Sequence, residues 1–225
     1  MRKALIVPGA AVRRYVRDAV EALPTVGISG ELLAAPGEPK VPADLGEYGR
    51  ELAGRITGGG GVDVLIGLSV GTQAAAVAAV ETAKAPRTCS PPPPGSVGRL
   101  VLISPTVDPA ARSAPRLVGR WLAGGRVEPV SLLPQQLPDW GRAGPARIAT
   151  VVRSARRFAI ERLLPGVSCP VTVVHAERDV ITSHAYAAHL AAAVDGDLVI
   201  VPGATHSWPH DDPARFAALI DRLIP

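Results

Sequence analysis

The chain has little cysteine, few aromatic residues and no long apolar run. Only 2 of its 225 residues are cysteine, and aromatic residues make up 4%. Neither Cys89 nor Cys169 has CxxC spacing or a histidine nearby, so the sequence predicts neither a metal site nor a disulfide framework. No apolar stretch is long enough to cross a bilayer, and we expect no membrane association.

Net charge is also small. Lys and Arg outnumber Asp and Glu by 24 to 20, a formal charge of +4. The basic residues are scattered and rarely interleaved with aromatic residues, which argues against a nucleic-acid partner.

The first residues imitate the start of a signal peptide. Met1-Arg2-Lys3 precedes the apolar run 4–7, but Pro8-Gly9 interrupts that run far too early for a secretory signal. We interpret residues 4–7 as a core strand and expect a cytoplasmic protein.

Apolar residues are plentiful, at 47%, and suffice for one domain with a sizeable core, residues 1–225. Short β-branched runs alternate with longer Ala-rich stretches, a pattern typical of βα units in a parallel sheet with helices on both faces. The fold class is therefore α/β, with a mostly parallel, doubly wound sheet of about six strands. The expected strands are 4–7, 30–34, 62–67, 100–104, 171–175 and 198–201. The expected helices between them are 12–23, 44–57, 70–83, 184–194 and 213–223.

This alternation lapses between the fourth and fifth strands. Residues 106–168 mix Arg, Trp, Pro and Leu, with helical character over 116–122 and 146–164. We expect a helical cap inserted over the sheet. The glycine tract 58–61 and the proline tract 91–94 are expected connectors, because neither favours a strand or a helix.

The strongest local signal is Gly67-Leu68-Ser69-Val70-Gly71, between a predicted strand and an Ala-rich predicted helix. A Gly-x-Ser-x-Gly turn in this context presents the serine hydroxyl above the carboxyl edge of the sheet. Small residues on either side of Ser69 let the strand and the helix approach closely enough for this turn. The sequence therefore predicts Ser69 as a nucleophile.

A serine hydroxyl needs a base to take its proton. His206 follows the last strand, so its loop opens at the same edge of the sheet as Ser69. His175 ends a strand, whereas His184 and His189 fall on a predicted helix, so structural or solvated roles suit these three better. His210 lies close enough to His206 to remain an alternative base.

The base in turn needs an acid that orients it and stabilises its charged form. Asp179 follows the fifth strand, and the chain order Ser69, Asp179, His206 is the one expected for this chemistry on an α/β sheet. Asp108 follows the fourth strand and remains an alternative acid.

With these loops, the chain resembles the α/β-hydrolase superfamily over nearly its whole length. The resemblance is carried by the turn at Ser69, the loop ending in Asp179, and Pro202-Gly203-Ala204-Thr205-His206. It implies an oxyanion hole formed by the backbone amides of Val70 and of Ala10 or Ala11. It also implies acyl transfer through an acyl-enzyme, with no cofactor. Because the two antiparallel strands that commonly begin this fold are missing, we expect a minimal version of it.

The substrate is less well determined. Trp121, Leu137 and Trp140 of the cap and Trp208 of the histidine loop are expected to contact it. We favour hydrolysis of a carboxylic ester or thioester with a small to medium acyl group. The alternatives are a chain-release or cyclising, lactone-forming enzyme and a non-catalytic ligand-binding protein. The arginine-rich cap is either a set of solvated helix faces or a surface for an acyl-carrier protein or a CoA thioester.

Overall fold

Six short runs rich in Val, Ile and Leu form one sheet in the computed structural model, which describes residues 1–83 and 95–224. The strand order is β2-β1-β3-β4-β5-β6, and every neighbouring pair is parallel. This confirms the expected fold class. The strands are β1 (Arg2–Val7), β2 (Ile28–Leu32), β3 (Val62–Leu68), β4 (Val97–Ile103), β5 (Val171–Ala176) and β6 (Asp197–Val201).

The strand boundaries agree with the sequence within a few residues, and β2 shows the cause of the differences. It begins two residues before the predicted 30–34, because Gly27 takes a left-handed conformation with φ 75° and ends the preceding 3-10 helix. The chain then pairs at once with β1, in the register Arg2 with Ile28 and Ile6 with Leu32. The proline tract 91–94 lies outside the described residues.

The helix predicted over 12–23 is instead divided into short pieces. These are the 3-10 helix η1 (Arg14–Val16), the helix α1 (Arg17–Glu21) and the 3-10 helix η2 (Leu23–Val26). Pro24 lies in the first turn of η2 and lacks the amide hydrogen that would continue α1. Outside residues 106–168, the remaining helices are α2 (Leu45–Gly58), α3 (Gly71–Glu81), α8 (His184–Ala192), α9 (Trp208–Asp211) and α10 (Pro213–Leu223).

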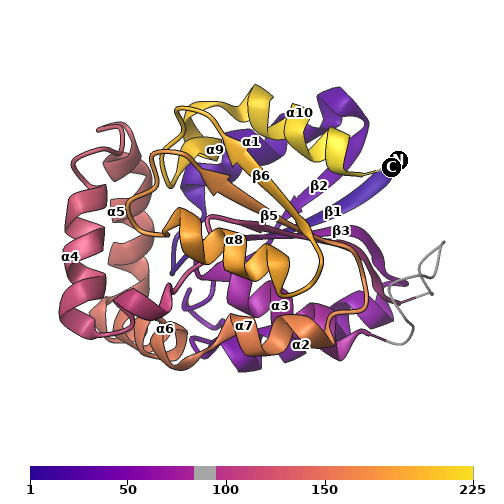
Figure 1. The fold of residues 1–225 in the computed structure, drawn as a ribbon, viewed down its shortest axis with the longest axis horizontal. Coiled ribbons are helices and arrows are strands. Elements are labelled where there is room, and N and C mark those ends of the chain that lie inside the picture. The colour runs from indigo at the N-terminus through magenta and orange to yellow at the C-terminus, as the bar shows by residue number, and fades with distance from the viewer. Residues whose placement is uncertain (84–94, 225) are drawn as a thin grey trace.

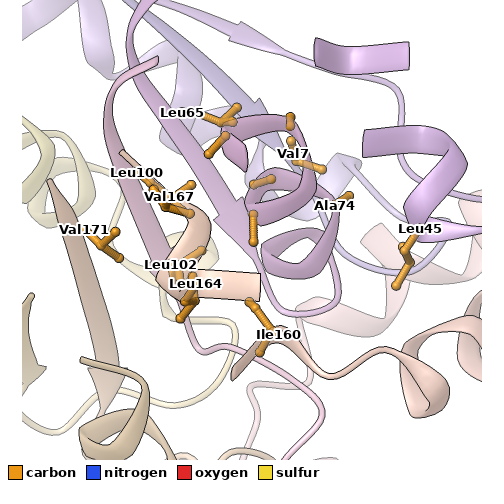
Figure 2. Packing of buried hydrophobic residues seen from close by; sticks show 14 of the residues in the cluster. Val7, Leu45, Leu65, Ala74, Leu100, Leu102, Ile160, Leu164, Val167 and Val171 are labelled. Atoms are coloured by element: carbon orange, nitrogen blue, oxygen red, sulfur yellow. The ribbon is translucent and has the colours of Figure 1, made fainter. Parts of the chain in front are cut away.

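Helices cover both faces of the sheet (Figure 1). Alternate strand residues point to opposite faces, so Leu5 and Leu65 join the cluster under α2, α3 and α8. Their neighbours Ile6 and Ile66 join the cluster under α1 and α10. Figure 2 shows the first of these clusters, with Leu65 from β3 and Ala74 from α3 in one apolar layer.

Residues 106–168, which we call the cap segment, lie between β4 and β5. They form η3 (Pro109–Ala111), α4 (Ala114–Gly124), α5 (Leu132–Ala143), α6 (Pro145–Arg157), α7 (Ile160–Leu163) and η4 (Leu164–Gly166). Figure 1 shows α4, α5 and α6 together at one end of the sheet. The sequence did not predict α5, because it contains Pro134 and Pro138. The predicted helix 146–164 is broken at Phe158, where the backbone is extended.

Within residues 1–83 and 95–224, no helix combines the length and the apolar character that crossing a bilayer requires.

Candidate active site

The turn at Ser69 joins the end of β3 to the start of α3. Ser69 has φ 53°, a left-handed conformation that costs free energy for a residue with a side chain. A Cβ atom on Gly67 would lie 2.6 Å from the Cα of Thr72, and one on Gly71 would lie 2.4 Å from the carbonyl oxygens of Val7 and Pro8. Both glycines are therefore required by close backbone approach. The Ser69 side chain is left partly exposed.

Three loops at the same edge of the sheet bring Ser69, His206 and Asp179 into hydrogen-bonding contact. The Oγ of Ser69 lies 3.0 Å from Nε2 of His206, and Nδ1 of the same ring lies 2.8 Å from Oδ2 of Asp179. The other carboxylate oxygen of Asp179 accepts hydrogen bonds from the amides of Ile181 and Thr182, at 2.8 and 2.9 Å. The carboxylate is thereby held in one orientation facing the imidazole.

The electrostatics of this pair favour its charged form. Burial by itself raises the pKa of Asp179, but the charge of His206 and the hydrogen bonds to the carboxylate lower it below the usual value. Burial lowers the pKa of His206, but the charge of Asp179, its hydrogen bond and the charge of Glu128 outweigh this and raise the pKa. The site therefore stabilises an imidazolium next to the serine.

The alternative acid lies elsewhere. Oδ2 of Asp108 accepts hydrogen bonds from Arg120 at 2.8 Å and from the hydroxyl of Ser183 at 2.6 Å. These contacts join the end of β4 to α4 and to the start of α8. Asp108, near the start of the cap segment, is therefore engaged by Arg120 and Ser183, and Asp179 is the carboxylate that contacts His206.

The other histidines are also placed apart from Ser69. His175 is 3% exposed, and its ring packs edge-on against His184 at 5.5 Å between centroids. Nε2 of His210 lies 3.3 Å from the hydroxyl of Ser131 in the cap segment. His189 lies on α8, in its last turn.

The resemblance implies three backbone amides as candidate oxyanion donors, and the backbone hydrogen bonds engage one of them. The amide of Ala11 donates to the carbonyl of Pro36 at 2.9 Å, so it is already occupied. Among the described residues, no backbone hydrogen bond uses the amide of Ala10 or of Val70. Val70 also precedes the first turn of α3, where the helix dipole favours negative charge. Of the three amides, the Ala11 amide thus has a backbone partner, whereas those of Val70 and Ala10 have none among the described residues.

The cap segment contacts the loops of Asp179 and His206 and the loop that follows β1. The indole Nε1 of Trp140 donates to the carbonyl of Ala10 at 3.1 Å. Nη1 of Arg120 donates to the carbonyl of Ile181, in the loop of Asp179, at 3.0 Å. Glu128 accepts hydrogen bonds in the loop of His206. The cap segment thus forms hydrogen bonds with three loops at this edge of the sheet.

Asp139, on α5 of the cap segment, also binds backbone amides outside that segment. Its carboxylate is 1% exposed, and Oδ2 accepts hydrogen bonds from the amides of Arg13 and Arg14, each at 3.0 Å. Oδ1 pairs with the guanidinium groups of Arg14 and Arg142. Sequence reasoning missed Asp139 and Glu128, because nothing local distinguishes such a carboxylate from a solvated one.

Of the residues expected to contact substrate, two lie together beside residues 8–11, which we call the oxyanion loop after its proposed role. The rings of Trp121 and Trp140 pack against each other with centroids 5.3 Å apart. Leu137 is 59% exposed on α5. Trp208 is 2% exposed and packs against Phe216, so it belongs to the core and the expectation for it was wrong. It is the first residue of α9.

Among the described residues, no group of three or more His, Cys, Asp or Glu side chains is placed to hold a metal ion.

Residues 8–219 match the model of the alpha/beta hydrolase family. The chain belongs to that family. Solved structures of similar fold include an esterase from Exiguobacterium antarcticum, with TM-score 0.77 and 14% identity over 100% of this chain and 92% of the other. Another is an enol-lactonase from Burkholderia xenovorans, with TM-score 0.69 and 15% identity over 100% and 92% of the two chains. At these identities the likeness establishes the fold of this α/β hydrolase.

Relatives at higher identity are known from mycobacteria. An uncharacterized protein of Mycobacterium tuberculosis (strain H37Rv) and one of Mycobacterium bovis are each 30% identical over 144 residues, which are 59% of this chain and 41% of the relative. The match therefore spans less than half of the length of these relatives.

The turn at Ser69 leads to a test of stability. Replacing Gly71 with Ala in this hydrolase should lower the free energy of unfolding by about 1–3 kcal/mol, because the new methyl group collides with the backbone of β1. Replacing Gly54 with Ala is the matched control, since nothing lies within 4 Å of a Cβ there. Urea unfolding measures both. Equal stability of the two variants would contradict this account of the turn.

Proposed function

We propose that this α/β hydrolase cleaves a carboxylic ester or thioester through an acyl-enzyme on Ser69. The observation that carries the proposal is the continuous hydrogen-bonded chain from Ser69 through His206 to Asp179, at 3.0 and 2.8 Å. A hydroxyl placed against a histidine that a carboxylate orients is the arrangement that activates a serine nucleophile.

The mechanism follows from this geometry in two halves. His206 takes the proton of Ser69 as its oxygen attacks the carbonyl carbon, and the amides of Val70 and Ala10 hold the oxyanion. The imidazolium, stabilised by Asp179, then gives the proton to the leaving group. His206 then takes a proton from water as the water attacks the acyl carbon, and it gives that proton to Oγ of Ser69 as the bond to the acyl group breaks, which releases the acid and restores the serine.

The surroundings of the oxyanion loop favour a small to medium apolar acyl group. Trp140 contacts Ala10, one of the two proposed oxyanion donors, and Trp121 packs on its ring. A carbonyl bound at Ala10 would place its substituents near these two rings.

The arginines of the cap segment give little support to a binding surface for an acyl-carrier protein or a CoA thioester. Several are engaged within the protein itself: Arg112 with Glu161, Arg120 with Asp108, Arg142 with Asp139, and Arg147 with carbonyl oxygens of residues 37, 38 and 41. We therefore place a simple ester ahead of a carrier-bound thioester.

The serine is tested directly. Ser69→Ala should reduce kcat/KM for a p-nitrophenyl ester at least about a hundredfold and abolish labelling by a fluorophosphonate probe, because the attacking oxygen is gone. Ser29→Ala, an exposed serine on β2, should leave both unchanged. Peptide mass spectrometry locates the label. Labelling of a residue other than Ser69, or residual hydrolysis above about a hundredth, would overturn the proposal.

The assignment of the acid is tested by replacing each of the two aspartates, Asp179 and Asp108, with asparagine. Asp179→Asn should lower kcat by several orders of magnitude, because the amide favours the wrong tautomer of His206. Asp108→Asn should cost far less, since Asp108 faces Arg120 and Ser183. Steady-state rates on one ester, with thermal unfolding of each variant, compare the two. A severe loss at Asp108 with a mild one at Asp179 would reverse the assignment.

The pH dependence has a definite sign. His206 acts as base only when unprotonated, so kcat/KM should fall as pH falls through its pKa and reach a plateau above it. Because Asp179 and Glu128 raise the pKa of His206, the midpoint should lie above the ordinary histidine value of about 6.5. Rates between about pH 5 and 9 measure it, with His210→Gln as the control expected to keep the wild-type profile. A flat profile, or a midpoint lower than the ordinary value, would argue against His206.

A further inference from the structure

The loop of His206 is held on both sides by one side chain of the cap segment. Glu128 lies between α4 and α5, and its Oε2 accepts a hydrogen bond from the hydroxyl of Thr205 at 3.2 Å. Both of its carboxylate oxygens lie 3.3 Å from the amide nitrogen of Ser207. Thr205 and Ser207 are the two neighbours of His206 in the chain, so Glu128 binds the residues on both sides of His206.

The charge of Glu128 is not neutralised by an ion pair within the described part of the chain. Among the ion pairs formed by the described residues, none includes Glu128, although its side chain is half-buried. Burial raises the pKa of its carboxyl, and the charge of His206 and the hydrogen bonds from Ser207 and Thr205 oppose that rise. The interaction is mutual, since Glu128 helps to raise the pKa of His206.

We propose that Glu128 is a positioning residue by which the cap segment holds His206 against Ser69 and stabilises the imidazolium formed during each acyl transfer. This inference rests on the proposed function and adds a second carboxylate to it. Asp179 orients the ring through Nδ1, whereas Glu128 orients the backbone that carries the ring.

The charged and titratable groups around this pair are few. His206 is faced by Asp179 and His175 from β5 and its loop, and by Glu128 from the cap segment. Glu128 is faced by His206 and by the buried phenol of Tyr15 from η1. A change in the pKa of His206 on removing the charge of Glu128 therefore has one simple source, the lost attraction between them.

Because the imidazolium is present in the transition state and not in the resting enzyme, Glu128 should act on kcat more than on KM. Glu128→Gln keeps the size and one acceptor oxygen but removes the charge. We expect kcat to fall about tenfold, as for loss of a hydrogen-bonded charge, with KM nearly unchanged. The pKa of His206 should fall because the attraction of Glu128 is lost, so the acid limb of the pH profile moves to lower pH.

The experiment combines two readouts on the same variants. The pKa of His206 is measured by NMR titration of its ring, and kcat, KM and the pH profile are measured with a p-nitrophenyl ester. Glu128→Asp keeps the charge and should preserve most of the elevated pKa. Glu161→Gln is the matched control, since Glu161 also belongs to the cap segment and binds Arg112 and Tyr186 away from His206. It should leave the pKa of His206 unchanged.

The outcomes separate the two proposals. An unchanged pKa and kcat in Glu128→Gln, or an equal change in Glu161→Gln, would overturn the role of Glu128. If Glu128→Gln fails to fold, a wild-type His206 pKa at or below the ordinary histidine value would overturn it as well. Absence of Ser69-dependent hydrolysis in the wild-type enzyme would overturn the proposed function, while the NMR titration would still decide whether Glu128 acts on His206.

Discussion

The whole site depends on one strained backbone turn. Ser69 is held in a left-handed conformation because β3, α3 and the end of β1 meet without room for side chains at Gly67 and Gly71. The same close approach places the start of α3 against Val7 and Pro8, where the oxyanion loop begins. The position of the hydroxyl and that of the proposed oxyanion donors are therefore set by a single packing contact.

A second constraint is electrostatic. His206 is largely buried, which disfavours a charge on its ring, yet carboxylates from two separate parts of the chain counteract this. Asp179 comes from the sheet and Glu128 from the cap segment. Preorganised charges stabilise a developing charge at no cost of reorganisation. The acid–base chemistry that we propose therefore draws on the cap segment as well as on the loop after β5.

Much of this arrangement was predictable from local sequence. The six strands were recognisable because those buried on both faces are nearly continuous in apolar residues. The turn at Ser69 was recognisable because its glycines stand at the spacing that the close approach demands. The helix α5 was not recognisable, since Pro134 and Pro138 disfavour a helix unless packing compensates, and here α5 packs on η1 and the oxyanion loop.

The sequence by itself determined the α/β class, the order of the strands along the chain and the turn at Ser69, because each depends on residues close together in the chain. Only the tertiary structure decided which aspartate reaches His206, which amides stay available near Ser69, and that Trp208 is a core residue. The tertiary structure also revealed Glu128 and Asp139 as anchors of the cap segment. These depend on individual contacts between residues far apart in the chain, and a single such contact leaves no local pattern in the sequence.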